Sequence, residues 1–110
     1  MLRRVEGTDR RLSQKLALRL ETDNKKLSAI ALAGDRSDPV NTLQFMATLG
    51  NVMRVFDPTL SDDEAFATAR SLGLAEGGDP ANGRMARPYA SIACQQAAGS
   101  ATICVLTPRS

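Results

Sequence analysis

Leucines alternate with other residues near the start of the chain, a pattern typical of a strand with one buried face. They occupy every second position at Leu16, Leu18 and Leu20. Because successive side chains of an extended chain point to opposite faces, this period predicts a strand over residues 15–22. Residues 27–33 show a weaker alternation, with Ile30 and Leu32 on one face, and the polar residues 23–26 favour a turn. We therefore expect a hairpin.

Residues 38–56 have a different period, with apolar positions at steps of three and four that predict an amphipathic helix. The carboxylate of Asp38 suits an N-cap, and Pro39 has the φ of a first helical residue. The helix is expected to end before Pro58, because a proline disfavours helical backbone at the preceding residue. Its apolar positions are Val40, Leu43, Phe45, Met46, Ala47, Leu49, Gly50, Val52, Met53 and Phe56. A stripe this broad suits a helix that lies across a sheet.

A second helix is predicted over residues 62–72. Ser61 and Glu64 have the spacing of a capping box, in which each side chain accepts a hydrogen bond from the other residue's backbone N–H. Gly73 is a favourable C-terminal stop. The residues expected on the buried side of this helix are Ala65, Phe66, Ala69 and Leu72.

Two further alternating stretches, residues 89–95 and 101–106, predict a second hairpin near the end of the chain. The economical arrangement is an α+β fold of order β-β-α-α-β-β, in which a four-stranded antiparallel sheet carries two helices on one face. We expect residues 15–108 to form a single domain. A mostly α fold with a C-terminal β-hairpin is the alternative, because the alanines within residues 15–33 also suit one helix.

Two stretches lack a clear period. Residues 1–14 are polar and rich in arginine, and we expect a mobile arm or a linker. Residues 75–88 are rich in turn-forming residues and predict a long loop, and long loops often carry binding residues. We therefore place a possible partner-binding loop at Arg84, Met85 and Arg87.

Composition narrows the chemistry that this chain can perform. It has 110 residues, of which 43% are hydrophobic, and a net charge of +2, which suits one globular domain. It contains no histidine, so the commonest general base and transition-metal ligand is missing. The sequence also contains no glycine-rich phosphate loop and no calcium-binding loop. We expect no catalytic residue, no cofactor and no metal ligand.

Cys94 and Cys104 are the most informative pair of residues. If the second hairpin closes through a three-residue loop at 98–100, the two cysteines face each other directly, and their Cβ atoms come within disulfide range. A disulfide indicates an oxidising compartment, so we expect a periplasmic or secreted protein. If the cysteines are reduced, they are small core residues of a cytoplasmic protein.

No apolar run of about eighteen residues occurs, so we expect no membrane span. The chain begins with the basic segment Met1-Leu2-Arg3-Arg4, and no apolar segment follows it. We therefore expect no signal peptide within these residues.

The leading functional hypothesis is a non-enzymatic interaction or ligand-binding module, the soluble extracytoplasmic part of a bacterial-type protein, with an unknown protein partner or a small ligand. The second is a small enzyme or enzyme subunit that uses carboxylates such as Asp35, Asp38 and Asp57. The third, nucleic-acid binding through the basic arm, is disfavoured because no aromatic platform accompanies the basic residues. These basic residues are Arg3, Arg4, Arg10, Arg11 and Lys15. The fourth is an oligomer-forming scaffold.

Overall fold

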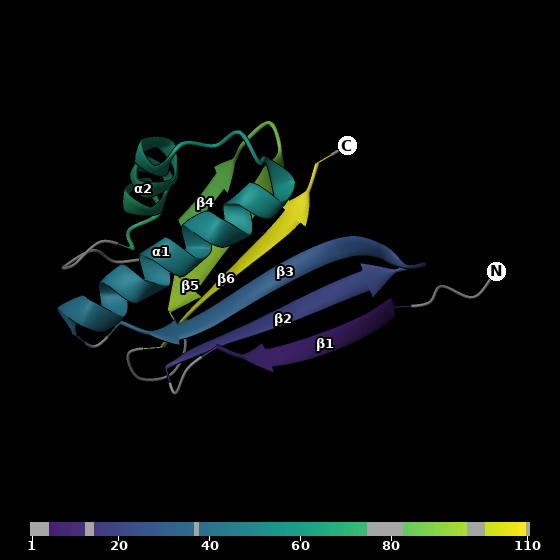
Figure 1. Ribbon diagram of the computed structural model, residues 1–110, viewed down its shortest axis with the longest axis horizontal. Helices are drawn as coiled ribbons and strands as arrows, with labels where there is room; N and C mark the ends of the chain where they lie inside the picture. Colours follow the sequence, from purple (N-terminus) through teal and green to yellow (C-terminus); the bar gives the residue numbers. More distant parts are fainter. Residues whose placement is uncertain (1–4, 13–14, 37, 75–82, 97–100, 110) are drawn as a thin grey trace.

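The computed structural model describes residues 5–12, 15–36, 38–74, 83–96 and 101–109 (Figure 1). Within them the chain forms an α+β fold with one antiparallel sheet and two helices, which confirms the predicted class. α1 crosses one face of the sheet, and α2 lies beside α1 (Figure 1). The elements follow one another as β1 (Val5–Arg11), β2 (Leu16–Asp23), β3 (Lys26–Asp35), α1 (Pro39–Phe56), α2 (Asp62–Ser71), β4 (Gly83–Ala86), β5 (Ala90–Gln96) and β6 (Ala101–Pro108).

The sheet has six strands in the order β1-β2-β3-β6-β5-β4, so the prediction of four strands is wrong. The elements follow one another along the chain as β-β-β-α-α-β-β-β, so the predicted chain order β-β-α-α-β-β is wrong as well. β1 lies within residues 1–14, where the sequence predicts an arm, and β4 lies within residues 75–88, where it predicts a loop. Both are edge strands. The side chains of residues 7–11 are exposed, and a strand with water on both faces needs no apolar alternation. β4 has only four residues, too few to show a period.

Both predicted hairpins are present. β2 and β3 are joined by Asn24 and Lys25, whose φ values of 54° and 67° are those of a two-residue turn that matches the twist of the strands. In the second hairpin Cys94 lies directly opposite Cys104, as the sequence predicts. The predicted loop at 98–100 lies outside the described residues.

α1 begins and ends where its capping residues predict. Asp38 Oδ1 accepts a hydrogen bond from the backbone N–H of Asn41 at 2.8 Å, and the helix ends at Phe56. Its buried residues are Thr42, Phe45, Met46, Leu49, Gly50, Val52 and Met53. The predicted apolar stripe is too wide, because Val40 is 63% exposed and Leu43 is 59% exposed. The sheet and α2 together cover the other side of the helix and leave this margin in solvent.

Ser61 caps α2, since its Oγ accepts a hydrogen bond from the N–H of Glu64 at 3.1 Å, which is one of the two hydrogen bonds of the predicted capping box. The prediction that Phe66 is buried is wrong, because its side chain is 47% exposed. Ala65 packs closely against Gly50 of α1, where a Cβ would lie 3.3 Å from the Ala65 Cβ. At this point α2 therefore contacts α1 through the small side chain of Ala65.

The core fills the space between α1 and the covered face of the sheet. Phe45 and Leu49 of α1 are fully buried, and they belong to the same cluster as Leu32. Gly34 permits this approach, because a Cβ there would lie 2.6 Å from Cδ2 of Phe45 and 2.7 Å from Cδ2 of Leu16. α1 therefore lies close to the sheet at the end of β3.

Arg36 ties the end of β3 to two distant segments. Its Nε donates a hydrogen bond to Oγ1 of Thr102 at 2.9 Å, and a terminal nitrogen donates to the carbonyl oxygen of Leu74 at 2.9 Å. Thr102 is fully buried. The guanidinium group therefore joins β3, β6 and the segment after α2.

Candidate functional site

The face of the sheet opposite the helices has no covering helix among the described residues (Figure 1). Side chains alternate along each strand, so the neighbours of the buried residues Ile30, Leu32, Cys104 and Leu106 point to this face. We call it the open face. Its central side chains are Ala31 and Ala33 of β3, Ile103, Val105 and Thr107 of β6, and Ser91, Ala93 and Gln95 of β5.

Small and branched side chains lie on adjacent strands of the open face. Both of these side chains on β3 are alanines, and all three on β6 are β-branched. The register pairs Ala31 with Val105 and Ala33 with Ile103. The surface therefore has a trough along β3 beside a ridge along β6.

Charged residues lie at both margins of the open face. One row of paired residues crosses all six strands, and we call it the central row. Its members in order are Asp9, Arg19, Ala31, Val105, Ala93 and Arg84. The apolar centre of the open face is thus flanked by an ion pair on one side and by Arg84 on the other.

At the β1 margin, Arg19 is held between two carboxylates. A terminal nitrogen of its guanidinium lies 2.8 Å from Oδ1 of Asp9, and Nε lies 3.3 Å from Oε1 of Glu21. These hydrogen bonds, that of Asp9 first, raise the pKa of Arg19 above its ordinary value. The Asp9 side chain is nevertheless 75% exposed, so it can accept a further donor.

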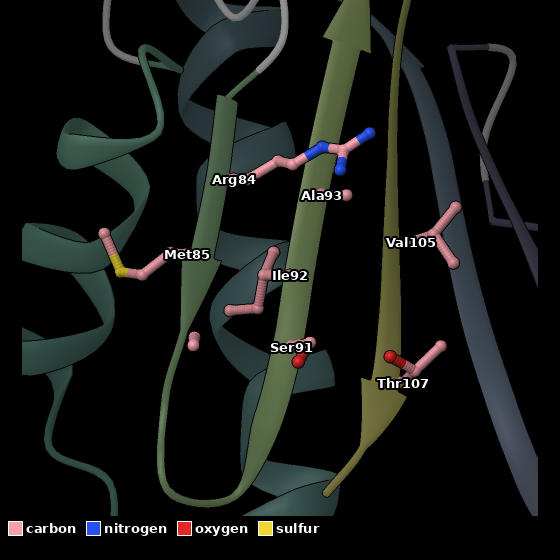
Figure 2. A pocket seen from close by; sticks show the side chains of 8 residues that line it. Arg84, Met85, Ser91, Ile92, Ala93, Val105 and Thr107 are labelled. Atoms are coloured by element: carbon pink, nitrogen blue, oxygen red, sulfur yellow. The ribbon is translucent and has the colours of Figure 1, made fainter.

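At the β4 margin, Arg84 reaches across β5 above Ala93 (Figure 2). Among the described residues its guanidinium has no ion-pair partner. Arg84 borders a hollow of about 400 Å³. The hollow is lined by Arg84, Met85, Ala86, Ser91, Ile92, Ala93, Val105 and Thr107.

Family models, curated proteins and solved structures were compared with this chain. None of them matches it. The function is therefore inferred from the residues of the open face. The sequence indicates which residues alternate along each strand. The open face, however, arises from the pairing of β3 with β6, which are about seventy residues apart. No local sequence pattern predicts that these two strands are neighbours.

The structure separates the three residues that were predicted to form a partner-binding loop. Arg84 lies on the open face, whereas Met85 points to the opposite side, toward α2 (Figure 2). Met85 packs against the core. Arg87 lies in the turn after β4, where its N–H donates to the carbonyl oxygen of Ala90 at 2.8 Å. Only Arg84 of these three can contribute to binding at the open face.

The two cysteines lie on the covered face of the sheet. Their Sγ atoms are 2.12 Å apart, which is the distance of a disulfide bond, and their Cα atoms are 4.0 Å apart. Cys94 is 2% exposed and Cys104 is fully buried. The pair therefore joins β5 to β6 from inside the core.

A second hollow of about 450 Å³ lies between α1 and α2. Its rim includes the exposed side chains of Leu43 and Phe66. The ion pair between Arg54 and Asp62 lies at the same hollow and joins the two helices. The other side chains that line this groove are mostly apolar. Its two charged residues, Arg54 and Asp62, are paired with each other, so neither is available to recognise a partner.

The three carboxylates of the enzyme hypothesis have separate places. Asp35 lies 3.4 Å from Nζ of Lys15 at the end of β3, Asp38 caps the start of α1, and Asp57 caps its end. Asp38 and Asp57 are therefore separated by the whole 18-residue helix. In the part of the chain that the structure describes, no three His, Cys, Asp or Glu side chains are close enough to hold a metal ion.

Two further expectations concern the arm and the membrane. Arg3 and Arg4 of the basic arm lie outside the described residues, and Arg10 and Arg11 lie on β1. Across the described ranges, no helix has the combination of length and apolar character that a bilayer crossing requires.

Proposed function

We propose that this protein is a non-enzymatic interaction module that binds a protein partner through the open face. One observation carries the proposal: the centre of an uncovered sheet face is lined by alanine, valine and isoleucine. In an antiparallel sheet with one face in water, outward positions are normally polar. A contiguous apolar surface with charged margins is instead typical of a binding site for another protein.

The shape of the open face favours a protein over a small molecule. Small-molecule sites are concave and bury most of the ligand surface. The hollow beside Arg84 lies on the surface of a sheet and is lined by short side chains such as Ser91, Ala93 and Thr107. A flat partner surface makes more contacts with such a site than a small ligand does.

The cysteine pair supports an oxidising, extracytoplasmic compartment for this module. Disulfides persist in the periplasm and outside the cell and are rare in the cytosol. The Sγ atoms of Cys94 and Cys104 lie at bonding distance in the core. Mass measurement of the unreduced protein, after alkylation of free thiols, tests this part: two alkylated cysteines per chain would contradict it.

Site-specific photocrosslinking tests the binding surface. The matched positions are Gln95, which is exposed on the open face, and Gln44, which is exposed on α1. Each is replaced in turn by a photoreactive benzoylphenylalanine, and the protein is irradiated in cells of its natural source. We expect covalent protein adducts from position 95 and few from position 44. Adducts from position 44 alone, or from neither position, would refute the open face as the binding surface.

A further inference from the structure

The trough and the ridge of the open face are complementary to each other. Consider a second copy of the chain related by a twofold axis that runs along the strands, midway between β3 and β6. This rotation places β6 of one copy over β3 of the other. Val105 then lies over Ala31, and Ile103 lies over Ala33, twice in each pair of copies. Large side chains then meet small ones at both of these register positions.

We propose that two copies of this chain form a symmetric dimer, open face to open face, about this axis. This inference rests on the proposed function and names the partner: a second copy. A twofold interface uses the same patch on both copies, so the patch must be complementary to itself. The adjacent trough and ridge meet that requirement.

Charge gives a second and independent match. The same rotation places β4 of one copy at the margin formed by β1 of the other, and the central row joins Arg84 and Asp9 through the register of all six strands. Arg84 therefore comes opposite Asp9. Arg84 has no ion-pair partner among the described residues, and the Asp9 side chain is 75% exposed. Each dimer gains two such pairs.

The alternative face-to-face arrangement lacks both matches. A twofold axis perpendicular to the strands places each strand over its own copy. Val105 then meets Val105, Ala31 meets Ala31, and Arg84 meets Arg84. Such a contact combines crowding along β6, gaps along β3 and repulsion at the β4 margin.

The size of the open face fits a dimer of modest affinity. Six strands at about 4.8 Å spacing, each about seven residues long, give a face of roughly 600 Å². A stable protein interface buries about 800 Å² on each partner. We therefore expect a reversible dimer whose proportion rises with protein concentration.

Sedimentation equilibrium of the unreduced protein over a range of concentrations tests the dimer directly. The mass is expected to rise from 11.8 kDa toward twice that value. Ala31→Glu should weaken association at least about tenfold, because it places a carboxylate in the trough beneath Val105. The matched control is Ala47→Glu, at an exposed position on α1, which should leave association unchanged. Circular dichroism melting verifies that both variants are folded.

A charge exchange tests the register of the dimer. Arg84→Glu alone and Asp9→Lys alone should each weaken association about tenfold, and the double variant should recover most of the loss. Both residues are exposed, so neither substitution threatens the core. Asp9→Lys also removes the contact of Asp9 with Arg19 in the same chain, but Arg19 keeps its contact with Glu21. Failure of the double variant to recover would overturn the proposed register.

The outcomes separate this inference from the proposed function. A protein that stays at the monomer mass at every concentration overturns the dimer. If position 95 still crosslinks to another protein, the open face remains a binding surface with a different partner. A dimer that Ala47→Glu abolishes and Ala31→Glu does not would place the contact on α1 and overturn both.

Discussion

Breaking the link between Cys94 and Cys104 should lower the free energy of unfolding by an amount that follows from the length of the loop it closes. The two cysteines are separated by 10 residues. The loop-entropy relation gives about 2.7 kcal/mol at 25 °C for a loop of this length. For a chain of 110 residues, an unfolding entropy of about 2.1 cal/mol/K per residue converts this loss to a fall in Tm of about 12 °C.

Differential scanning calorimetry with and without a reducing agent measures this effect. Reduction keeps both sulfur atoms in the core, so it isolates the effect of the covalent link. The double variant Cys94→Ala with Cys104→Ala should melt at or below the temperature of the reduced protein, because it also leaves small cavities in the core. This variant is the matched control for the reagent, since its own Tm should not respond to reduction.

The reasoning fails if the protein melts at the same temperature in both conditions while thiol titration finds that both cysteines have been reduced. That result would mean that residues 94 and 104 stay close together in the unfolded chain even without the link. A fall in Tm that is equally large in the double variant would instead show that the reagent acts elsewhere.

Three other substitutions should change stability in urea titrations by amounts that follow from burial and capping. Phe45→Ala removes a fully buried ring and should lower the free energy of unfolding by about 3–5 kcal/mol, whereas Val40→Ala, at an exposed position of α1, should change it by no more than about 0.5 kcal/mol. Similar losses at both positions would contradict the assigned buried face of α1. Gly34→Val forces a Cβ to within 2.6 Å of the Phe45 ring and should cost about 1–3 kcal/mol or more, so an unchanged midpoint would refute the close approach of α1. Ser61→Ala removes the cap of α2 and should cost about 1 kcal/mol, and Ser61→Asp should restore most of it.

Local signals in the sequence predict much of the fold because each depends on a few neighbouring residues. The alternating leucines of β2 reflect one face in contact with the core, and Asp38 and Pro39 favour a helix start whatever lies elsewhere. Cys94 and Cys104 are paired within one hairpin, so their opposition depends only on the length of its loop. These predictions are confirmed.

The sequence predicts less where a residue's environment is set by a distant element. Val40 and Leu43 fit the apolar period of α1, but their side chains are exposed. Whether they are buried depends on how α1, α2 and the sheet pack together, which the sequence of α1 alone does not show. β1 and β4 lack an apolar period because edge strands gain their order from hydrogen bonds to β2 and β5. The open face also depends on residues that are far apart in the sequence, because it forms only when all six strands pair in this order.

The cysteine pair and the open face lie on opposite sides of the same two strands. Cys94 and Cys104 point into the core, while Ala93 and Val105 beside them point outward. Inward and outward residues alternate along each strand. A link between the inward cysteines therefore also fixes the distance between the outward side chains of the same two strands. A binding surface whose strands are held in place loses less conformational entropy on association than one that must become ordered. On the proposed function, the link therefore supports binding as well as folding, and it does so without occupying any of the surface that the partner contacts.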